Sequence, residues 1–375
     1  MEPIVIVGAG LSGAVFAERC ANVLNKKVIV IEKRQHVAGN CYDFIDENGI
    51  IVSKYGAHIF HTSDKEVWQY IQKFAKWHPY EHKVLSYVNG KLVPIPININ
   101  TVNHLLGLNL KSSLSMKKWI RSQTIKTKNF INSEEVALSR VGNKKLYELM
   151  FKNYTYKQWS FWPKELEPSV LSRIPIRFNK NDRYFDDVYE AIPNKGYTDL
   201  IEQMLSNPLI EVVLNTDYFD IKKSLPKEST IVYTGPIDRY FDNKFDVLQY
   251  RSLRFETETI NTESYQQAAV INYPSLAVPY TRIVEYKKLY GSKSNKTVIS
   301  REFPTWEGEP FYPVPTQRNR DLYEKYKYEA SQIPNTIFVG RLANYKYFNM
   351  DQAIKNALQI FMSEFMVSNK YRNTY

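Results

Sequence analysis

The sequence predicts an α/β protein whose parallel-sheet domain is interrupted by other domains. A β-branched run at 3–7 leads into the pattern G-x-G-x-x-G, and a second apolar run at 28–31 follows a helix-like segment. A further strand-glycine-helix pattern occupies 336–361. Short apolar runs separated by helical segments are typical of β-α-β units in a parallel sheet. Because the pattern recurs near the C-terminal end, we expect the chain to leave this domain and return to it.

The first glycine loop has the spacing of a Rossmann-like dinucleotide-binding fingerprint. Gly8 permits the tight turn, Gly10 lets the backbone approach a pyrophosphate, and Gly13 lets helix pack on strand. The N-terminus of the helix presents free N–H groups to the phosphates. Glu32, 19 residues after Gly13, ends the second strand, where a carboxylate can accept from a ribose hydroxyl. A bound dinucleotide is predicted, with NAD and FAD both open at this point.

The middle of the chain changes character twice. Residues 100–165 lack strand alternation and carry apolar residues at helical spacing, which predicts a mainly helical insertion. Residues 170–190 and 230–315 are rich in β-branched and aromatic residues with proline breaks, which predicts an antiparallel sheet. The predicted domains are a nucleotide-binding domain of 1–80 plus 191–240 plus 330–375, a helical insertion of 81–165, and a sheet substrate domain of 166–190 plus 241–329.

Bulk composition limits the partners. Hydrophobic residues make up 43% and charged residues 24% of the chain, as in ordinary soluble enzymes, whereas the 28 tyrosines suit recognition of sugars and bases. The net charge is +11, and no Asp or Glu lies between His82 and Ser133. Such a basic segment could attract an anionic substrate, a membrane surface or nucleic acid, or be a solvated helical face. No nucleic-acid motif accompanies the charge, so nucleic acid is excluded as a partner.

Cysteine and histidine usage argues against structural metal or disulfides. Cys20 and Cys41 are too few for a disulfide framework or a zinc site. His58 and His61 are three residues apart, but no third convergent ligand is evident, so no metal is predicted. No charged leader precedes the first strand and no apolar run reaches the roughly 18 residues of a membrane span. We therefore expect a cytoplasmic protein without a transmembrane segment.

Arginines among aromatic residues are the best candidates for binding a substrate. Arg173 and Arg177 flank Ile-Pro-Ile, Arg282 follows Pro-Tyr-Thr, and Arg341 follows the last predicted strand. A guanidinium matches phosphate oxygens bidentately, and one charge-assisted hydrogen bond contributes about 1.5–3 kcal/mol. Two such side chains converging on one diphosphate would anchor a nucleotide-linked substrate, although each alone could equally form a surface ion pair.

Eight ordered segments between Met1 and about Ala357 make the chain resemble the bacterial UDP-galactopyranose mutase family. These segments are Gly8-x-Gly10-x-x-Gly13, Lys54-Tyr-Gly-Ala-His-Ile-Phe-His-Thr62, Tyr154-Thr-Tyr-Lys-Gln-Trp159, Arg173-Ile-Pro-Ile-Arg-Phe178, Tyr233-Thr-Gly-Pro-Ile-Asp238, Pro279-Tyr-Thr-Arg-Ile283, Phe311-Tyr-Pro-Val314 and Gly340-Arg-Leu-Ala343. As an ordered set they are highly specific. The resemblance implies FAD rather than NAD as the dinucleotide.

The resemblance implies an isomerase without net oxidation. Members of the family interconvert the pyranose and furanose forms of a nucleotide-linked sugar, with N5 of reduced FAD as the nucleophile at the anomeric carbon. The diphosphate leaves, the sugar ring opens and recloses, and the diphosphate returns. UDP-galactopyranose and UDP-galactofuranose are the implied pair, and a nucleophile on the cofactor would explain why the sequence has no nucleophilic Ser or Cys motif.

Roles for individual residues also follow from the resemblance. Arg173, Arg282 and His61 are the expected catalytic residues: both arginines resemble the pair that holds the diphosphate, and His61 resembles a histidine beside the isoalloxazine. Arg173 would lie on a mobile loop that closes over the substrate and excludes water. The expected cofactor-binding residues are Gly8, Gly10, Ser12, Gly13, Glu32, Lys33, Gly39, Asn40, His58, Arg341 and Met350.

The expected substrate-binding residues are mostly aromatic. Tyr154 resembles the residue that stacks on the base, and Trp159 resembles an aromatic residue of the substrate pocket. The expected substrate-binding residues are Tyr154, Thr155, Trp159, Tyr184, Phe185, Asn272, Tyr312, Tyr347, Asn349 and His82, of which Tyr184, Tyr312 and Tyr347 resemble diphosphate-binding tyrosines.

Three positions depart from the family pattern. Ala38-Gly39 stands where Gly-Gly is usual, and Asn349 stands where bacterial members usually carry Asp. His82 occupies a position that is usually Asn in galactose-binding members. Because the last two changes fall near the expected sugar pocket, a dTDP-fucopyranose mutase of the same mechanism, acting on a 6-deoxy sugar, is the alternative.

Two other function classes remain open on the sequence. An FAD-dependent amine oxidase would share the nucleotide-binding domain but not the Arg-Tyr substrate set. A non-catalytic nucleotide-binding module would bind nucleotide sugars without isomerising them. The resemblance further implies a homodimer, because family members are commonly dimers, and a role in polysaccharide biosynthesis, because furanose donors usually feed surface polysaccharide.

Overall fold

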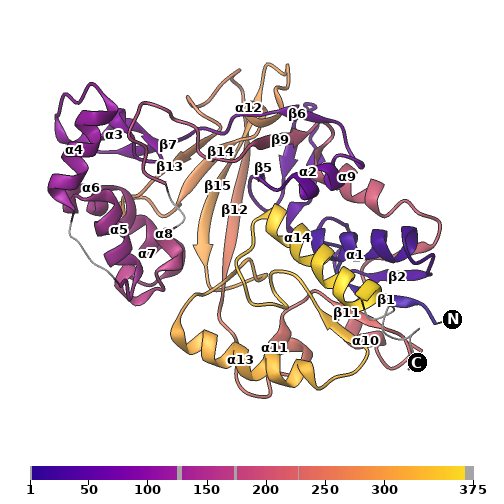
Figure 1. Cartoon of the computed structure of the whole chain (residues 1–375). Coiled ribbons are helices and arrows are strands. Elements are labelled where there is room, and N and C mark those ends of the chain that lie inside the picture. The colour runs from indigo at the N-terminus through magenta and orange to yellow at the C-terminus, as the bar shows by residue number, and fades with distance from the viewer. Residues whose placement is uncertain (1, 125–128, 173–174, 227, 368–375) are drawn as a thin grey trace.

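A five-stranded parallel sheet is the framework of the nucleotide-binding part of the molecule (Figure 1). The computed structural model describes residues 2–124, 129–172, 175–226 and 228–367. The strand order is β10 (Ile210–Val213), β2 (Val28–Ile31), β1 (Ile4–Val7), β11 (Ile231–Tyr233) and β17 (Thr336–Phe338). These strands come from three separate stretches of the chain, and every neighbouring pair is parallel.

Alternating side chains of this sheet enter two different cores. Ile6 and Val232 pack with residues of α1 (Leu11–Asn22), α9 (Gly196–Met204) and α14 (Met350–Phe361). On the opposite face, Val5 and Tyr233 pack with Tyr218 of α10 (Tyr218–Ile221). Successive strand residues point to opposite faces, so a parallel sheet covered on both sides needs apolar residues at nearly every position. In Figure 1 the yellow α14 runs beside the indigo α1 on one of these faces.

The register of the sheet aligns the strand ends that carry the glycine loop. Val7 is the partner of both Ile31 and Tyr233, so β1, β2 and β11 end at one edge. The loop at 8–10, Glu32 and the Thr234-Gly235 turn therefore emerge side by side. In open parallel sheets, ligands bind in the crevice outside the carboxyl ends of the strands.

A seven-stranded, mostly antiparallel sheet stands beside the nucleotide-binding part (Figure 1). Its order is β16 (Tyr312–Pro313), β12 (Tyr250–Ile260), β15 (Thr297–Thr305), β14 (Arg282–Glu285), β13 (Val270–Asn272), β7 (Val84–Val88) and β8 (Lys91–Ile95). Only the β13–β7 pair is parallel.

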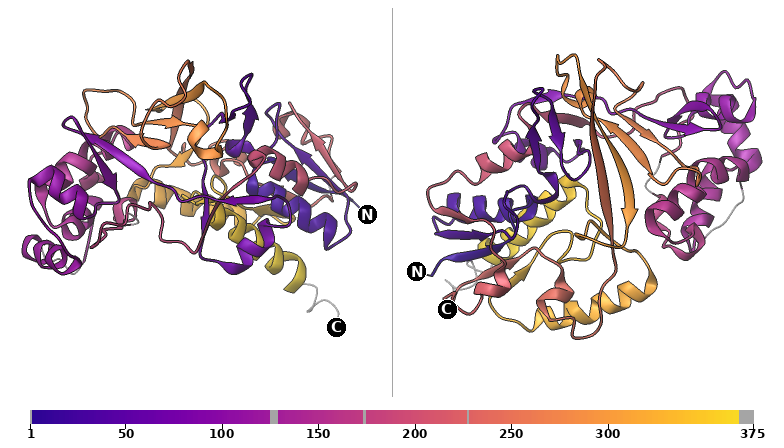
Figure 2. Two further views of the ribbon diagram at one scale, coloured as in Figure 1. Left: turned by 90° about the horizontal axis from the view of Figure 1, so that it is seen from above. Right: turned by 180° about the vertical axis from the view of Figure 1, so that it is seen from behind.

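Helices gather at the β7–β8 end of this sheet, on the side away from α1 and α14 (Figures 1 and 2). They are α3 (Ile99–Leu106), α4 (Ser113–Gln123), α5 (Ser133–Val141), α6 (Lys144–Tyr147), α7 (Asn153–Trp159) and α8 (Ser169–Ser172). Their buried residues, such as Met116, Val141 and Leu146, share one core with Val84, Val270 and Val298 of the sheet.

Further elements pack beside these two sheets. They are the hairpin β3 (Asp43–Ile45) and β4 (Ile51–Ser53), the sheet β5 (Phe60–Thr62), β9 (Tyr189–Pro193) and β6 (Trp77–Pro79), and the helices α2 (Lys65–Ile71), α11 (Ile237–Tyr240), α12 (Lys287–Tyr290) and α13 (Gln317–Ser331). Within the described ranges, no helix combines the length and apolar character needed to cross a membrane, and no three His, Cys, Asp or Glu side chains gather as metal ligands. Cys20 and Cys41 are buried thiols.

Two stretches in the middle of the chain differ in secondary structure from what their surroundings predict. Residues 84–95, inside the segment expected to be mainly helical, form the β7–β8 hairpin of the large sheet. The Asn89-Gly90 turn, with φ of 48° and 79°, is the strongest short-range hairpin signal, and it outweighs the helical spacing found further along. Residues 169–172 form α8, and among the described residues that follow, regular strand begins at β9; Pro175 has no backbone N–H to donate within a sheet.

Candidate functional site

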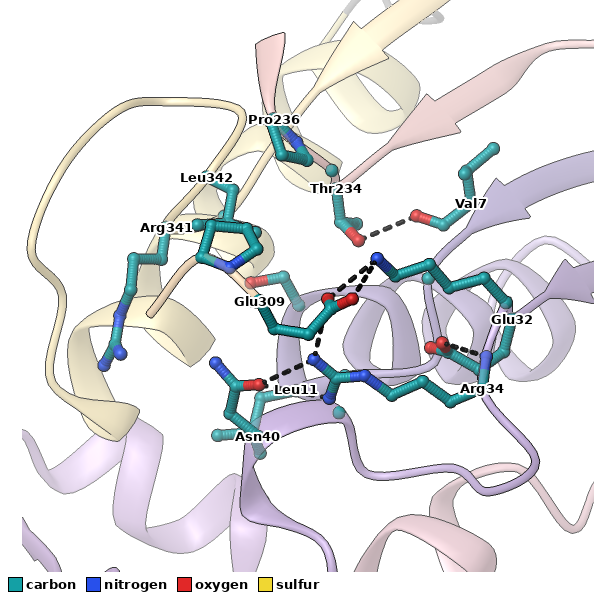
Figure 3. A pocket seen from close by; sticks show the side chains of 18 of the residues that line it. Val7, Leu11, Glu32, Arg34, Asn40, Thr234, Pro236, Glu309, Arg341 and Leu342 are labelled. Atoms are coloured by element: carbon teal, nitrogen blue, oxygen red, sulfur yellow. Dashed lines mark hydrogen bonds and ion pairs between the residues drawn. The ribbon is translucent and has the colours of Figure 1, made fainter. Parts of the chain in front are cut away.

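A cavity of about 430 Å³ lies at the carboxyl edge of the parallel sheet (Figure 3). The loop after β1, the ends of β2 and β11, the turn after β17 and the start of α14 line it. The predicted cofactor-binding residues that line the cavity are Gly8, Gly10, Ser12, Glu32, Lys33, Gly39, Asn40, His58, Arg341 and Met350. Gly13 lies behind the loop and not in the wall. The structure therefore gathers residues from both ends of the chain around one concave site.

The three loop glycines are required for different reasons. Gly8 has φ +104°, and a Cβ there would lie 2.2 Å from the Thr234 Oγ1. A Cβ on Gly13 would lie 1.9 Å from the Gly8 carbonyl oxygen, so helix and strand could not approach. Gly10 differs, because its φ of −79° suits any residue and its nearest neighbour would be the Gly39 Cα at 3.9 Å. Among the described residues, no protein atom fills the space beside the Gly10 Cα. This open cradle can therefore accept a ligand group such as a pyrophosphate.

Glu32 holds the glycine loop as well as facing the cavity. Its Oε2 accepts from the Ala9 backbone N–H at 2.9 Å, and its Oε1 accepts from the Arg34 backbone N–H at 3.0 Å. The side chain is buried and lines the cavity. Each carboxylate oxygen keeps a second lone pair, so the predicted bond from a ribose hydroxyl remains available.

Arg341 joins this cavity to a cluster of aromatic side chains. Its Nη1 donates to the Phe311 carbonyl at 3.3 Å and its Nη2 to the Phe348 carbonyl at 2.5 Å. The guanidinium lies 5.2 Å from the Tyr347 ring centre and 5.7 Å from that of Tyr312. A cation at this distance from an aromatic face is attracted to it. The same side chain therefore borders the cavity and the predicted substrate-binding tyrosines.

The aromatic cluster brings four predicted substrate-binding residues together. The rings of Tyr312 and Tyr347 stack with centroids 5.2 Å apart, and Trp159 meets them edge-on at 6.3 and 6.5 Å. Burial raises the pKa of Tyr154 far above its ordinary value, although the positive charge of Arg282 opposes this effect. Burial likewise raises the pKa of Tyr312. These phenols stay protonated at neutral pH, so they can donate hydrogen bonds to an anion.

Arg282 stands beside this cluster, paired with a carboxylate that the sequence analysis missed. β14 and β15 place Arg282 opposite Glu302, and the Arg282 Nε donates to the Glu302 Oε2 at 2.5 Å. Glu302 is 1% exposed and Arg282 is 28% exposed. Burial by itself would lower the pKa of Arg282, but the Glu302 carboxylate outweighs it and raises the pKa, so the cation persists. Asn272 on β13 is the other cross-strand neighbour of Arg282.

A second group of rings surrounds Phe185. His61 stacks on Phe185 at 3.6 Å, His82 lies 5.8 Å away on a nearly parallel plane, and Tyr184 meets Phe185 edge-on at 5.0 Å. The His61 Nδ1 lies 2.6 Å from the Asp187 Oδ2. His61 thus belongs to this group rather than to the cavity wall, where His58 lies instead.

His82 is held neutral in this group. Burial lowers its pKa to about 3, and the positive charge of Arg282 and the proximity of His61 act in the same direction. Its Nδ1 is buried and has no hydrogen-bond partner among the described residues. His82 therefore offers a neutral ring close to Arg282, at the position where the sequence analysis noted a departure from the family.

The remaining predicted residues fall in three places. Thr155 is buried on α7, and Asn349 precedes α14 at the cavity, with its backbone N–H donating to the Gln352 Oε1 at 3.0 Å. Arg177 forms an ion pair with Asp186 and donates to the Phe185 carbonyl at 3.1 Å, so its charge is used within the protein. Arg173 lies outside the described residues.

Glu302 and Lys157 are two of the polar side chains near the site that were not predicted, and others, among them Arg34 and Glu309, line the cavity. Glu302 gave a weak signal, an acidic residue in a strand-like stretch, which becomes meaningful only when β15 pairs with β14. Lys157, inside the quoted Tyr154–Trp159 segment, donates to the backbone carbonyls of Tyr273 at 2.7 Å and Ser275 at 3.1 Å, and also to that of Tyr280. It ties α7 to the segment that leads into Arg282.

Acid should destabilise the protein through His82. Its folded-state pKa of about 3 lies below the unfolded value of about 6.5, so the unfolded state binds the proton first as the pH falls. The stability that this neutral ring contributes is present above pH 6.5 and is lost progressively toward pH 3. Between pH 7 and pH 5 the free energy of unfolding should fall by about 2 kcal/mol more in the native protein than in His82→Asn.

Urea titrations at the two pH values measure this difference. The control is His104→Asn, because His104 is exposed on α3. An equal pH dependence of unfolding in His82→Asn and the native protein would contradict the neutral buried state of His82.

Comparisons with known proteins agree on one family. A family model described as UDP-galactopyranose mutase matches residues 149–347, and one described as an NAD(P)-binding Rossmann-like domain matches residues 6–74. The dTDP-fucopyranose mutase of Escherichia coli is 37% identical over 369 residues, which cover 96% of this chain and 97% of that protein. The UDP-galactopyranose mutase of Mycoplasma genitalium is 35% identical over 381 residues, covering 94% and 92%.

A solved structure shows the same fold. The crystal structure of a reduced UDP-galactopyranose mutase superposes with a TM-score of 0.76 over 97% of this chain and 95% of that one. Its sequence identity to this chain is 16%, so this likeness concerns the fold alone.

Proposed function

The chain belongs to the UDP-galactopyranose mutase family, and from this premise we propose that it isomerises a nucleotide-linked sugar between pyranose and furanose rings without net oxidation. One observation carries the proposal to this chain's own residues. Arg282 and the aromatic cluster of Tyr154, Trp159, Tyr312 and Tyr347 adjoin the dinucleotide cavity, and Arg341 borders both. A cofactor bound in the cavity and a substrate diphosphate bound at the aromatic cluster would therefore lie on either side of Arg341.

We propose that the dinucleotide in the cavity is FAD, active in its reduced form. The open cradle at Gly10 and the buried Glu32 carboxylate support a dinucleotide, and family membership supports a flavin. When bound, the reduced flavin would supply the nucleophile, for which the sequence has no Ser or Cys motif. The residues of the chain would then bind, orient and protect the reactants.

The charged and phenolic groups fit the handling of a diphosphate leaving group. Arg282 keeps its charge because of Glu302, and the hydroxyl groups of Tyr312 and Tyr347 can donate to phosphate oxygens. Donors held in place before the reaction stabilise charge as it develops on the leaving oxygen and keep the diphosphate close for its return. We propose Tyr154 and Trp159 as the wall for the base, and Arg173 as the second diphosphate cation on the strength of the family resemblance.

The sugar is proposed on the same evidence. We propose UDP-galactopyranose as the substrate, with dTDP-fucopyranose as the second candidate. Relatives bearing the two names are similar to this chain to nearly the same degree, so overall identity does not decide between them. His82 beside Arg282 and uncharged Asn349 at the cavity support the second candidate, because both depart from the family pattern near the expected sugar pocket and Asn349 removes a negative charge there.

The deciding experiment incubates dithionite-reduced, FAD-loaded protein with each donor separately and separates the products by chromatography. Furanose product from either donor supports the proposal, and the faster donor identifies the sugar. Absence of furanose from both donors would overturn it. Oxygen uptake with an amine would support an oxidase, whereas donor binding without isomerisation would support a non-catalytic module.

The homodimer implied by the family resemblance is also a proposal, and light scattering of the purified protein tests it. The furanose product would serve polysaccharide biosynthesis.

Asn349→Asp should shift the preference between the two donors toward UDP-galactopyranose. The change restores the carboxylate usual in bacterial members, and a carboxylate suits the N-terminus of α14, so stability should be unaffected. The ratio of kcat/KM values should move by about tenfold, the scale of one charge-assisted hydrogen bond. Asn243→Asp, at an exposed position outside the cavity, is the matched control. An unchanged ratio would exclude Asn349 as a determinant of sugar choice.

A further inference from the structure

A carboxylate from the loop after β15 reaches the end of β2 at the cavity. The Glu309 carboxylate lies 2.7 Å from the Lys33 Nζ and 3.3 Å from the Arg34 Nη2. All three residues line the cavity, although about 275 positions separate Glu309 from its partners. In Figure 3 the Glu309 side chain points toward Arg34 from the opposite side of the site.

The Arg34 side chain is also held by residues other than Glu309. Its Nη1 and Nη2 donate to the Asn40 Oδ1 at 3.1 and 3.0 Å, and its guanidinium lies 4.7 Å from the centre of the Tyr55 ring. The Arg34 side chain is only 16% exposed. Glu309 therefore meets one fixed, partly buried cation, together with Lys33, which is 40% exposed.

The base of the Glu309 loop is anchored on β12. The Ser252 Oγ donates to the Glu309 backbone carbonyl at 2.6 Å. Gly308 has φ +102°, and a Cβ there would lie 3.1 Å from the same Ser252 Oγ, so the loop approaches β12 closely. Burial would raise the pKa of Glu309, but Lys33 and Arg34 outweigh it and lower the pKa, which keeps the carboxylate ionised at neutral pH.

We propose that Glu309, Lys33 and Arg34 form a clasp over the dinucleotide cavity that slows the release of the bound cofactor. Lys33, Arg34 and Asn40 line one side of the cavity, and Gly308, Glu309 and Pro310 line the other, so the ion pairs join the two sides. A ligand seated on Gly10 and Glu32 leaves past these residues only when the ion pairs open. The inference rests on the proposed binding of FAD.

The electrostatic nature of the clasp sets its expected behaviour. The Glu309 side chain is 42% exposed, so salt should weaken its ion pairs. Cofactor release from the native protein should therefore accelerate with ionic strength. A variant without the carboxylate should release the cofactor faster at low salt and respond less to added salt.

The experiment dilutes FAD-loaded protein and follows the rise of free flavin fluorescence in about 0.05 M and about 0.5 M NaCl, between which the screening length falls from about 14 to about 4 Å. Glu309→Gln should release flavin roughly threefold to fivefold faster at low salt, as expected for loss of an exposed ion-pair network. Its release rate should change less with salt than that of the native protein. Lys33→Gln, which leaves the Arg34 pair, should give a smaller acceleration.

Glu66→Gln is the matched control, because Glu66 pairs with Lys355 at 2.9 Å on the surface and does not line the cavity. Its release rate and salt response should equal those of the native protein. Native release kinetics in Glu309→Gln would overturn the clasp while leaving the FAD proposal intact. Failure of the native protein to take up FAD would overturn both. Thermal melting of each variant identifies a folding defect. If Glu309→Gln has such a defect, the release rate of Lys33→Gln and its response to salt decide whether the clasp exists.

Discussion

Arg282→Ala should lower kcat for the preferred donor by about a hundredfold or more while the protein still binds FAD. Arg282 is the charged group beside Tyr154 and Tyr312 that can neutralise a departing diphosphate, and losing one such preorganised donor typically costs 10²–10³ in rate. Steady-state kinetics of the reduced enzyme measure the loss, and flavin absorbance measures cofactor content. Native kcat in this variant would contradict the diphosphate role.

A structural cost must be separated from the catalytic one. Arg282→Ala leaves the buried Glu302 carboxylate without its cation, and breaking a buried pair on one side typically costs about 3–5 kcal/mol. Adding Glu302→Gln removes that unpaired charge, so the double variant should regain stability but not activity. Arg301→Ala is the control: Arg301 is adjacent to Glu302 in β15 and forms an ion pair with Glu258 on the neighbouring strand β12. It should keep native kinetics.

Gly10→Ala should abolish flavin binding while leaving the fold intact. Its backbone angles suit alanine, and the added Cβ would meet only the Gly39 Cα at 3.9 Å, so apoprotein stability should equal or slightly exceed that of the native protein. The methyl group would instead occupy the space that a pyrophosphate needs. Thermal melting of the apoprotein and flavin absorbance after loading measure the two effects separately.

Two other glycines provide contrasts for this test. Gly13→Ala should fail to fold stably, because its Cβ would overlap the Gly8 carbonyl oxygen. Gly49→Ala should lose stability through its φ of +73° but keep flavin binding, because no atom lies within 4 Å of the new Cβ and Gly49 is outside the cavity. Flavin uptake by Gly10→Ala at the native level would mean that the cofactor pyrophosphate does not approach this position.

Local patterns predicted the nucleotide-binding part well and the second sheet less well. The glycine loop, the strands at 231–233 and 336–338 and the helix at 350–361 could be predicted because apolar period and glycine spacing act within one β-α-β unit. The β7–β8 hairpin was missed, although its Asn89-Gly90 turn was visible in the sequence. The segment at 178–185 offered no comparable cue, since Tyr184 and Phe185 pack against His61 and His82 rather than in a strand.

The sequence by itself determined that this chain has a dinucleotide loop, which arginines and tyrosines could bind a nucleotide-linked substrate, and which family it resembles. These inferences depend on residues close together in the chain or on short ordered motifs. Only the tertiary structure decided that Glu302 lies against Arg282, that His58 rather than His61 lines the cavity, and that Glu309 reaches Lys33 and Arg34. Strand register and loop path create these contacts between residues 20 to 276 positions apart, and no local pattern encodes a partner at that separation.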